Sequence, residues 1–241
     1  MQISTQGIVL QTVNYSDTAV IAKIFTLHHG LVSFMVKGVR KKNARFAANL
    51  FSPCSILSMN YLFKVNKNLQ FVNEISCDVP LTNLQSNPLK SCIAFFMAEV
   101  CVKSIKEQEQ DELLFDCIRH FIELLNDTED SIKQFHHYFL LQLANKLGFG
   151  PQGIYNDMHT VFDLREGIFQ SSYPVYPEFV INRTAELISL FTNSTFENSI
   201  SITASKAERN SLLATLLFYF DLHVLHGSKI KSTDVLSEMM A

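Results

Sequence analysis

The densest concentration of chemistry in this sequence is a cluster of positive charge. Five cations fall within nine residues, and they are Lys37, Arg40, Lys41, Lys42 and Arg45. Such a cluster repels itself, and a polyanion that neutralises it removes that cost. Lysine and arginine together suit phosphate oxygens, and each contact releases condensed counterions. The cluster indicates a phosphate-binding loop; a solvated loop that only protects a sheet edge is the alternative.

The charge of the whole chain, −3, conceals an uneven distribution. Residues 1–80 hold eight Lys/Arg against three Asp/Glu, a net charge of +5, whereas residues 81–241 carry −8. Lys64 and Lys67 belong to the basic part and lie near a predicted hairpin turn, where they extend the cationic surface. A basic N-terminal third points to a nucleic acid as the partner.

Aromatic residues bear on the same question, because proteins that bind single strands stack bases on exposed rings. Residues 1–80 contain several Phe and Tyr residues, and most of them are needed to fill an interior. Phe46 and Tyr61 are the candidates for exposure. Whether either ring stacks on a base is left open by the sequence.

No catalytic or metal-binding motif accompanies this cluster. His136 and His137 are adjacent, so on a helix they point about 100° apart and cannot chelate one ion together. Gly148-Phe149-Gly150 follows a predicted helix and lacks the Lys-Ser/Thr of a phosphate loop. We therefore expect no enzyme, no cofactor and no metal.

The cysteines favour the same interpretation. No two of them have the short spacing of a zinc knuckle or a redox motif, and they are Cys54, Cys77, Cys92, Cys101 and Cys117. Their mostly apolar neighbours predict reduced, buried thiols that act as small hydrophobic side chains.

The residues before position 80 have the pattern of short strands. Runs rich in β-branched and aromatic residues alternate with turn residues, and the expected strands are 8–13, 19–27, 31–36, 55–63 and 69–77. Five short strands joined by tight turns predict a small closed β-barrel, since closure removes exposed sheet edges.

After residue 80 the period becomes helical. Asn87 suits a helix cap and Pro88 the first helical position, and Ser205 with Glu208 predicts a capping box. Apolar stripes predict further helices, over 111–126, 130–147 and 177–191. Residues 160–169 predict a small β hairpin. The fold class is thus α+β, with a barrel domain over 1–80 and a mainly helical domain over 81–241.

Composition limits the class of protein further. The chain has 241 residues and 47% hydrophobic residues, which is enough for a sizeable core. No apolar run approaches the roughly 20 residues of a membrane span, and the first residues lack the basic and apolar blocks of a signal peptide. We expect a cytoplasmic protein without a membrane partner.

An ordered set of motifs resembles the RecO family of bacterial recombination mediators. The motifs of the basic third are Gly7-Ile8-Val9-Leu10, Tyr15-Ser16-Asp17, Phe25-Thr26 with Gly30, and Lys37-Gly38-Val39-Arg40 through Arg45-Phe46. Those of the helical part are Leu140-Leu141, Leu147-Gly148-Phe149, Phe162-Asp163-Leu164 with Gly167 and Phe169, and Gly227 with Ile230-Lys231-Ser232 and Val235-Leu236. Each motif is loose, whereas the ordered set covers almost the whole chain.

The resemblance implies an N-terminal OB fold and a helical C-terminal domain. It also implies binding of single- and double-stranded DNA, annealing of complementary strands, and help in loading the RecA recombinase onto DNA coated by single-stranded-DNA-binding protein (SSB). RecR and the C-terminal tail of SSB are the implied protein partners, and a bacterial, nucleoid-associated location follows. By motif, DNA contact falls on Lys37, Arg40, Lys41, Lys42 and Arg45, and charge and turn position add Lys64 and Lys67.

One departure from the family pattern concerns zinc. Many RecO proteins carry four zinc-binding cysteines after the Leu-Gly-Phe helix end, but residues 148–164 contain no cysteine here. We expect no structural zinc, and we expect Ile154, Tyr155 and Met158 to hold the Pro151–Gly153 segment by packing.

Two other classes of function stay open. The protein could be a protein–protein adaptor that acts through its helical domain, with an inert basic loop. It could also be an RNA-directed OB module, which a preference for RNA over DNA of the same sequence would reveal, because only RNA offers the 2′-hydroxyl.

Overall fold

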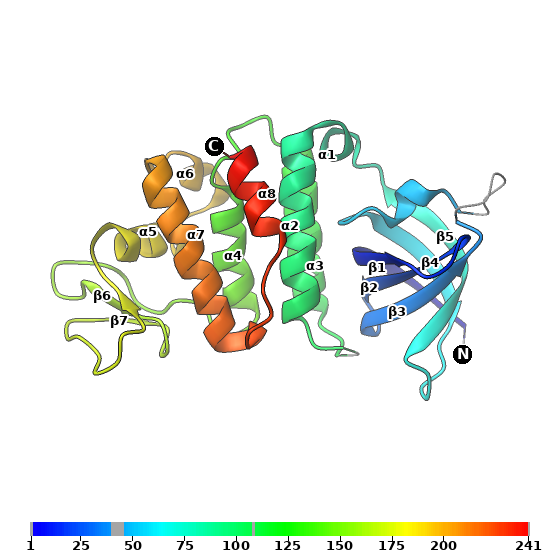
Figure 1. Cartoon of the computed structure of the whole chain (residues 1–241), viewed down its shortest axis with the longest axis horizontal. Coiled ribbons are helices and arrows are strands. Elements are labelled where there is room, and N and C mark those ends of the chain that lie inside the picture. Colours follow the sequence, from blue (N-terminus) through cyan, green and yellow to red (C-terminus); the bar gives the residue numbers. More distant parts are fainter. Residues whose placement is uncertain (1, 40–45, 108, 241) are drawn as a thin grey trace. The chain divides into compact units, whose positions relative to one another are not determined.

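A computed structural model describes residues 2–39, 46–107 and 109–240. The chain divides into two compact units, Met1–Asp127 and Thr128–Ala241, which are described separately below (Figure 1). The domain boundary predicted at residue 80 falls just after the last barrel strand, inside the first unit.

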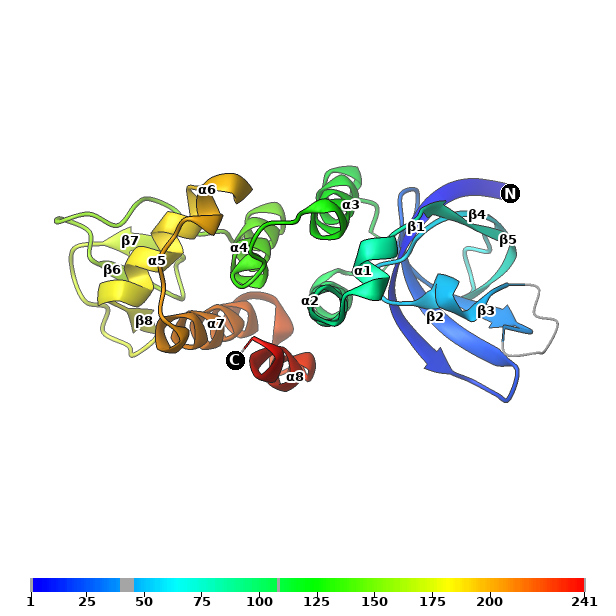
Figure 2. The same ribbon diagram turned by 90° about the horizontal axis from the view of Figure 1, so that it is seen from above.

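The first unit begins with a closed five-stranded barrel. The strands are β1 (Gln2–Asn14), β2 (Ala19–Thr26), β3 (Gly30–Lys37), β4 (Ile56–Leu62) and β5 (Leu69–Val79). Their order around the barrel is β1-β2-β3-β5-β4, with every pair antiparallel except β3 and β5 (Figure 2). This is an OB-like barrel, so the predicted fold of the basic third is confirmed.

Alternation along the strands divides the barrel into an interior and an outer surface. On β2, Val20, Ala22 and Ile24 point into the core, whereas Ile21 and Lys23 are only partly buried. Gly7 of β1 permits a close approach across the interior, because a Cβ there would lie 2.6 Å from the Ile24 side chain.

Helices complete the first unit. They are the short 3-10 helix η1 (Ala48–Phe51), α1 (Thr82–Ser86), α2 (Pro88–Ser104) and α3 (Glu112–Asp127). The Asn87 side chain accepts hydrogen bonds from Leu89 N and Lys90 N, with Pro88 at the first helical position, so the predicted cap is confirmed. Phe25 and Phe115 pack with ring centroids 5.8 Å apart, which joins β2 to α3.

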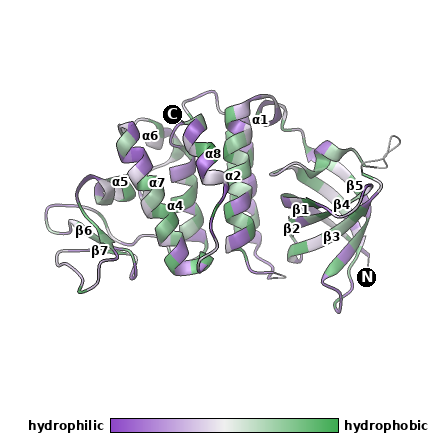
Figure 3. Ribbon diagram, in the orientation of Figure 1, coloured by the Kyte–Doolittle hydropathy of each residue, from purple (hydrophilic) through white to green (hydrophobic). Residues whose placement is uncertain are grey.

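The second unit combines helices with a small sheet. Its elements are α4 (Phe135–Lys146), β6 (Val161–Asp163), β7 (Ile168–Gln170), β8 (Phe179–Val180), α5 (Asn182–Thr192), α6 (Phe196–Ile200), α7 (Lys206–Phe220), the π-helical turn η2 (Asp221–Leu225) and α8 (Ser232–Met239). The predicted capping box of Ser205 and Glu208 opens α7. In Figure 3, apolar residues are distributed through both units.

Two expectations about this unit need correction. The predicted hairpin forms as β6 and β7, but β8 adds a third strand by pairing Phe179 with Asp163 and Val180 with Phe162. The predicted helix 177–191 therefore begins only at Asn182. Phe179 and Val180 instead pair with Asp163 and Phe162, which lie 16 and 18 positions earlier in the chain, and helical periodicity does not reveal such a pairing.

The Pro151–Gly153 segment is also held differently from the expectation. Of the three residues expected to pack there, Ile154 and Met158 are exposed, whereas Tyr155 is partly buried and its N donates to Ser189 Oγ at 2.9 Å. Instead, Gln152 N donates to Gly167 O at 2.8 Å and Phe169 N donates to Gln152 O at 3.1 Å. Backbone pairing with the β6–β7 hairpin therefore replaces the side-chain packing that we predicted.

Candidate nucleic-acid interface

The outer surface of four neighbouring strands, from the end of β1 across β2 and β3 to the start of β5, presents a row of apolar side chains. Val13 pairs with Ile21, Ile21 with Met35, and Met35 with Phe71, each directly across neighbouring strands. Directly opposed residues share one face of a sheet, so these four form a continuous line across the barrel, which we call the apolar row. Val13 is 54% exposed and Phe71 48% exposed at its two ends.

Lys37 lies at one side of this row. It is the exposed last residue of β3, two positions beyond Met35. Its Nζ lies 5.4 Å from the centroid of the Phe71 ring, within the range of a cation–π contact. The structure thus brings a predicted phosphate-binding cation against an aromatic ring from a different strand.

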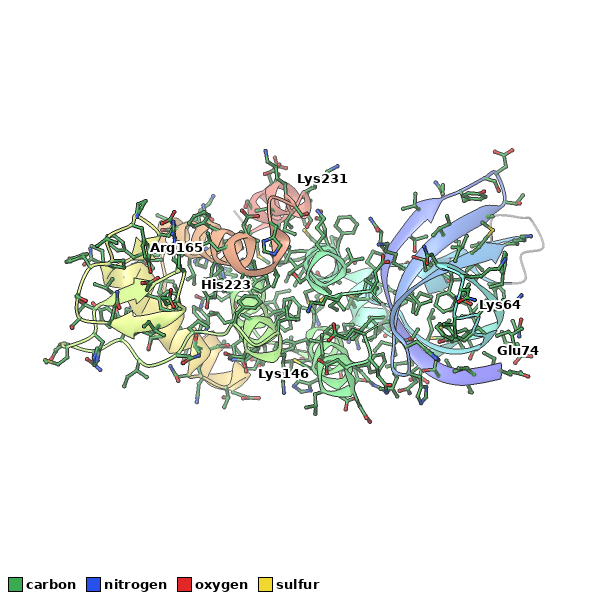
Figure 4. All side chains as sticks on the ribbon, turned by 90° about the horizontal axis from the view of Figure 1, so that it is seen from below. Lys64, Glu74, Lys146, Arg165, His223 and Lys231 are labelled. Atoms are coloured by element: carbon green, nitrogen blue, oxygen red, sulfur yellow. The ribbon has the colours of Figure 1, made fainter. Side chains whose placement is uncertain are left out.

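Lys64 and Lys67 lie at the other side, in the loop between β4 and β5 (Figure 4, Lys64). Both are exposed, and the loop closes through a hydrogen bond from Lys67 N to Lys64 O at 3.1 Å. β3 and β5 run in parallel, with Ser33 beside Leu69 and Met35 beside Phe71. Along this shared direction the β4–β5 loop comes before Phe71, and Lys37 comes after Phe71. Phe71 therefore lies between Lys37 on one side and the loop of Lys64 and Lys67 on the other.

Of the three acidic residues within residues 1–80, Asp17 is exposed in the β1–β2 turn, and Glu74 and Asp78 lie on the β4–β5 ribbon. Glu74 accepts from Asn60 Nδ2 at 2.9 Å on the β4–β5 ribbon, beyond a bulge at Asn60/Tyr61. Asp78, on the same ribbon, accepts from Ser58 Oγ at 2.5 Å. Lys23 is neutralised by Glu107 at 2.8 Å, so it adds little to the cationic surface.

The structure therefore brings together three of the seven predicted site residues, Lys37, Lys64 and Lys67, on one side of the barrel. The other four lie outside the described residues, and they are Arg40, Lys41, Lys42 and Arg45. Val39 and Phe46, the described residues on either side of them, both pack in the barrel core.

Both aromatic residues that were candidates for exposure, Phe46 and Tyr61, are buried. Tyr61 has no exposed surface, and its hydroxyl lies 2.7 Å from His29 Nδ1. Burial raises the pKa of Tyr61 to about 12. Phe46 belongs to the core cluster, so neither ring is available to a base.

The exposed ring, Phe71, was missed by reasoning from the sequence. It follows Gln70, which is polar and yet points into the barrel with 2% of its surface exposed. Gln70 and Phe71 thus reverse the usual rule that apolar residues face inward. Only the two-residue alternation of side chains along β5 could have predicted that Phe71 faces outward.

Histidines and cysteines form no reactive cluster in the part of the chain that the structure describes. No three His, Cys, Asp or Glu side chains there are grouped to hold a metal ion. His137 Nε2 lies 2.9 Å from Arg209 O, and His223 Nε2 lies 2.9 Å from Leu164 O. Cys54 and Cys101 are buried as predicted, and burial raises the pKa of Cys54 to about 12, but Cys77 is exposed on β5.

A cavity of about 750 Å³ occurs in the second unit. Leu217 and Phe218 are part of its apolar lining. Its charged lining residues are Lys229, Lys231, Asp221 and Asp234. Figure 4 labels Lys231. Two lysines against two aspartates leave this cavity without net charge, so the barrel is the stronger anion-binding candidate.

None of the helices in the described ranges is long and apolar enough to cross a membrane.

The closed barrel, with its exposed Phe71 ring and neighbouring lysines, belongs to the OB-like class of folds, whose members bind oligonucleotides and oligosaccharides. Two family models match the chain, Recombination protein O N terminal over residues 1–78 and Recombination protein O C terminal over residues 85–234. The chain therefore belongs to the RecO family of DNA repair proteins.

Curated relatives agree over the full length. The chain is 32% identical to the DNA repair protein RecO of Flavobacterium psychrophilum, with all of both chains covered. It is 31% identical to that of Phocaeicola vulgatus and 30% identical to that of Azobacteroides pseudotrichonymphae, with 98% of each chain covered.

Proposed function

We propose that this protein is a non-catalytic DNA-binding mediator of recombination. It binds the phosphate backbones of single- and double-stranded DNA through the barrel and anneals complementary strands. Phosphate contacts carry no sequence information, so binding has little sequence preference. Together with RecR, it helps to load RecA onto DNA coated by SSB.

The observation that carries this proposal is the placement of Lys37, Lys64 and Lys67 on either side of the apolar row. In OB folds the face of strands 2 and 3 and the β1–β2 and β4–β5 loops bind oligonucleotides. Lys37 ends β3 and the other two lysines occupy the β4–β5 loop. The basic run Arg40–Arg45 follows β3 in sequence and supplies four further cations.

We assign the two kinds of partner, DNA and protein, to different parts of the chain. DNA is assigned to the barrel, because the helical part is acidic, with a net charge of −8 over residues 81–241. The C-terminal tail of SSB is assigned to the helical part as a whole and to no individual residues. The same proposal includes a cytoplasmic, nucleoid-associated location in bacteria and no cofactor.

The test is a salt titration of binding to a fluorescently labelled single-stranded oligonucleotide. Each phosphate contact contributes about 0.7 to the slope of log affinity against log salt. Replacing Arg40, Lys41, Lys42 and Arg45 by Ala should flatten the slope by roughly 3, and replacing Lys37, Lys64 and Lys67 by roughly 2. A matched variant that lacks Lys133, Lys146 and Lys206 of the second unit should keep the original slope.

An unchanged slope in both barrel variants, with folding intact, would contradict the proposal and favour the adaptor. Tighter binding of RNA than of DNA of the same sequence would favour the RNA-directed module instead.

A further inference from the structure

Phe71 has an unusual position among the aromatic residues of the barrel. Phe25, Phe34, Phe51 and Tyr61 are buried, and the interior is therefore complete without the Phe71 ring. Phe71 instead lies on the outer surface with 48% of its area exposed. A large apolar side chain that the core does not use is a candidate for contact with a ligand.

The ring does not stand alone on this surface. It ends the apolar row, in which Met35 is its direct neighbour on β3. The row places side chains from four strands in register, and none of its four members belongs to the barrel core cluster. An apolar line with Lys37 at one side and the loop of Lys64 and Lys67 at the other fits a ligand that carries both flat apolar groups and negative charge.

The cations around Phe71 select the kind of ligand. Lys37 Nζ lies 5.4 Å from the ring centroid on one side, and the loop with Lys64 and Lys67 precedes Phe71 on the other. A polynucleotide strand running over β5 would meet a cation, an aromatic ring and a second cation in succession. That order matches phosphate, base and phosphate. Tyr15 is 61% exposed in the β1–β2 turn, but Asp17 lies two residues away in the same turn, where its carboxylate would repel a phosphate.

We propose that Phe71 is a stacking site for one unpaired base, flanked by phosphate contacts to Lys37 and to the β4–β5 loop. This inference rests on the proposed function and specifies how the barrel distinguishes its substrates. In a duplex both faces of each base are covered by neighbouring base pairs, so a duplex offers only its phosphates to this surface. When the bound strand pairs with its complement, the base therefore leaves Phe71, and the protein binds the annealed duplex less tightly than the single strand.

The first test compares affinities for a single strand and for the duplex of the same sequence. Phe71→Leu removes the ring and keeps apolar bulk. It should weaken binding of an oligothymidylate by about 5- to 150-fold, the range measured for loss of one base–aromatic stack. Duplex affinity and the salt slope should stay unchanged, because no phosphate contact is lost. Phe95→Leu, the same substitution at a ring of α2 that is 54% exposed, is the control.

A second test reports on stacking directly. The chain contains no tryptophan, so Phe71→Trp introduces a unique fluorophore at the site. Its fluorescence should be quenched saturably by oligothymidylate and much less by the duplex at equal occupancy. Val175→Trp, at a fully exposed position of the second unit, should show no change.

The outcomes separate this inference from the proposed function. Equal loss of single-strand and duplex affinity in Phe71→Leu, or no loss of either, would overturn the stacking site. The lysine and arginine variants would still flatten the salt slope in that case, and DNA binding by the barrel would stand. A protein that binds neither form of DNA would overturn both.

Discussion

The buried side chain of Gln70 holds Lys64 by two hydrogen bonds. Gln70 Oε1 accepts from Lys64 N at 3.0 Å, and Gln70 Nε2 donates to Lys64 O at 2.9 Å. The same Nε2 also donates to Lys67 O at 2.6 Å. One side chain inside the barrel thereby organises the loop that presents two of the candidate phosphate-binding cations.

Replacing Gln70 by Leu should therefore affect both stability and binding. The loop loses three hydrogen bonds to a buried partner, and we expect the free energy of unfolding to fall by about 1–3 kcal/mol. Lys64 and Lys67 would no longer be held in place, so the salt slope of DNA binding should fall by up to about 1.4, the value for two contacts. Urea denaturation and the salt titration measure the two effects.

Asn66→Ala is the matched control for this prediction, since Asn66 is an exposed residue of the same loop. A Gln70→Leu protein with the stability and the salt slope of the parent would show that the loop does not depend on Gln70.

Asp163 should be a main determinant of stability in the second unit. Its buried carboxylate accepts from Arg165 N at 2.9 Å, Glu166 N at 3.1 Å and the Tyr176 hydroxyl at 2.7 Å. Asp163→Ala leaves these donors without a partner, and we expect a loss of about 2–5 kcal/mol. Asp163→Asn keeps one acceptor oxygen and should lose less.

Chemical denaturation measures this series, with Glu166→Ala as the control because that side chain is exposed at the same turn. Equal stability of Asp163→Ala and Glu166→Ala would contradict the assignment.

The protein should contain no structural zinc. Residues 148–164 contain no cysteine, and the β6–β7 hairpin there is held by backbone pairing and by the hydrogen bonds of Asp163. We expect metal analysis of the purified protein to find far less than one zinc per chain, and a chelator to leave the thermal unfolding temperature unchanged. One zinc per chain that survives dialysis would disprove this expectation.

The buried pair His136 and His137 should make the second unit sensitive to acid. Burial lowers the pKa of His137 to about 4, and burial together with the neighbouring His137 lowers that of His136 well below its ordinary value. Both rings stay neutral in the fold but are protonated in the unfolded chain below about pH 6.5. Protons therefore favour unfolding, and stability falls as the pH drops from 6.5 toward 4.

The expected loss approaches roughly 1.4 kcal/mol per pH unit for each histidine. Urea denaturation between pH 7.5 and 5 measures it. His136→Leu/His137→Gln should flatten the pH dependence whatever its effect at pH 7, while His159→Gln, at an exposed position, should not. The same steep pH dependence in the double variant would refute this origin.

Much of the fold was predictable because it depends on neighbours in the sequence. The cap of Asn87 and Pro88 and the capping box of Ser205 and Glu208 each involve residues one to three positions apart. The five barrel strands likewise follow from runs of apolar residues bounded by turns. The cationic cluster and the family resemblance also require nothing beyond the order of residues.

The candidate site was predictable only as charge. Lys37 and Lys64 stand out by type, but their common surface depends on the parallel pairing of β3 with β5, which joins residues more than thirty positions apart. The same pairing places Phe71 outside and Gln70 inside, against the order of their hydrophobicity. Closure of the barrel likewise buries Tyr61, a candidate for exposure, against Phe34, with ring centroids 4.9 Å apart.

Caps, turns, strand periods and net charge were thus determined by the sequence alone, because hydrogen bonds between near neighbours and alternation along a strand act within a few residues. The tertiary structure decided which ring is exposed, which polar side chain is buried and which cations share a surface. Those properties depend on strand pairing between distant segments, where burial of the whole barrel interior outweighs the preference of any single side chain.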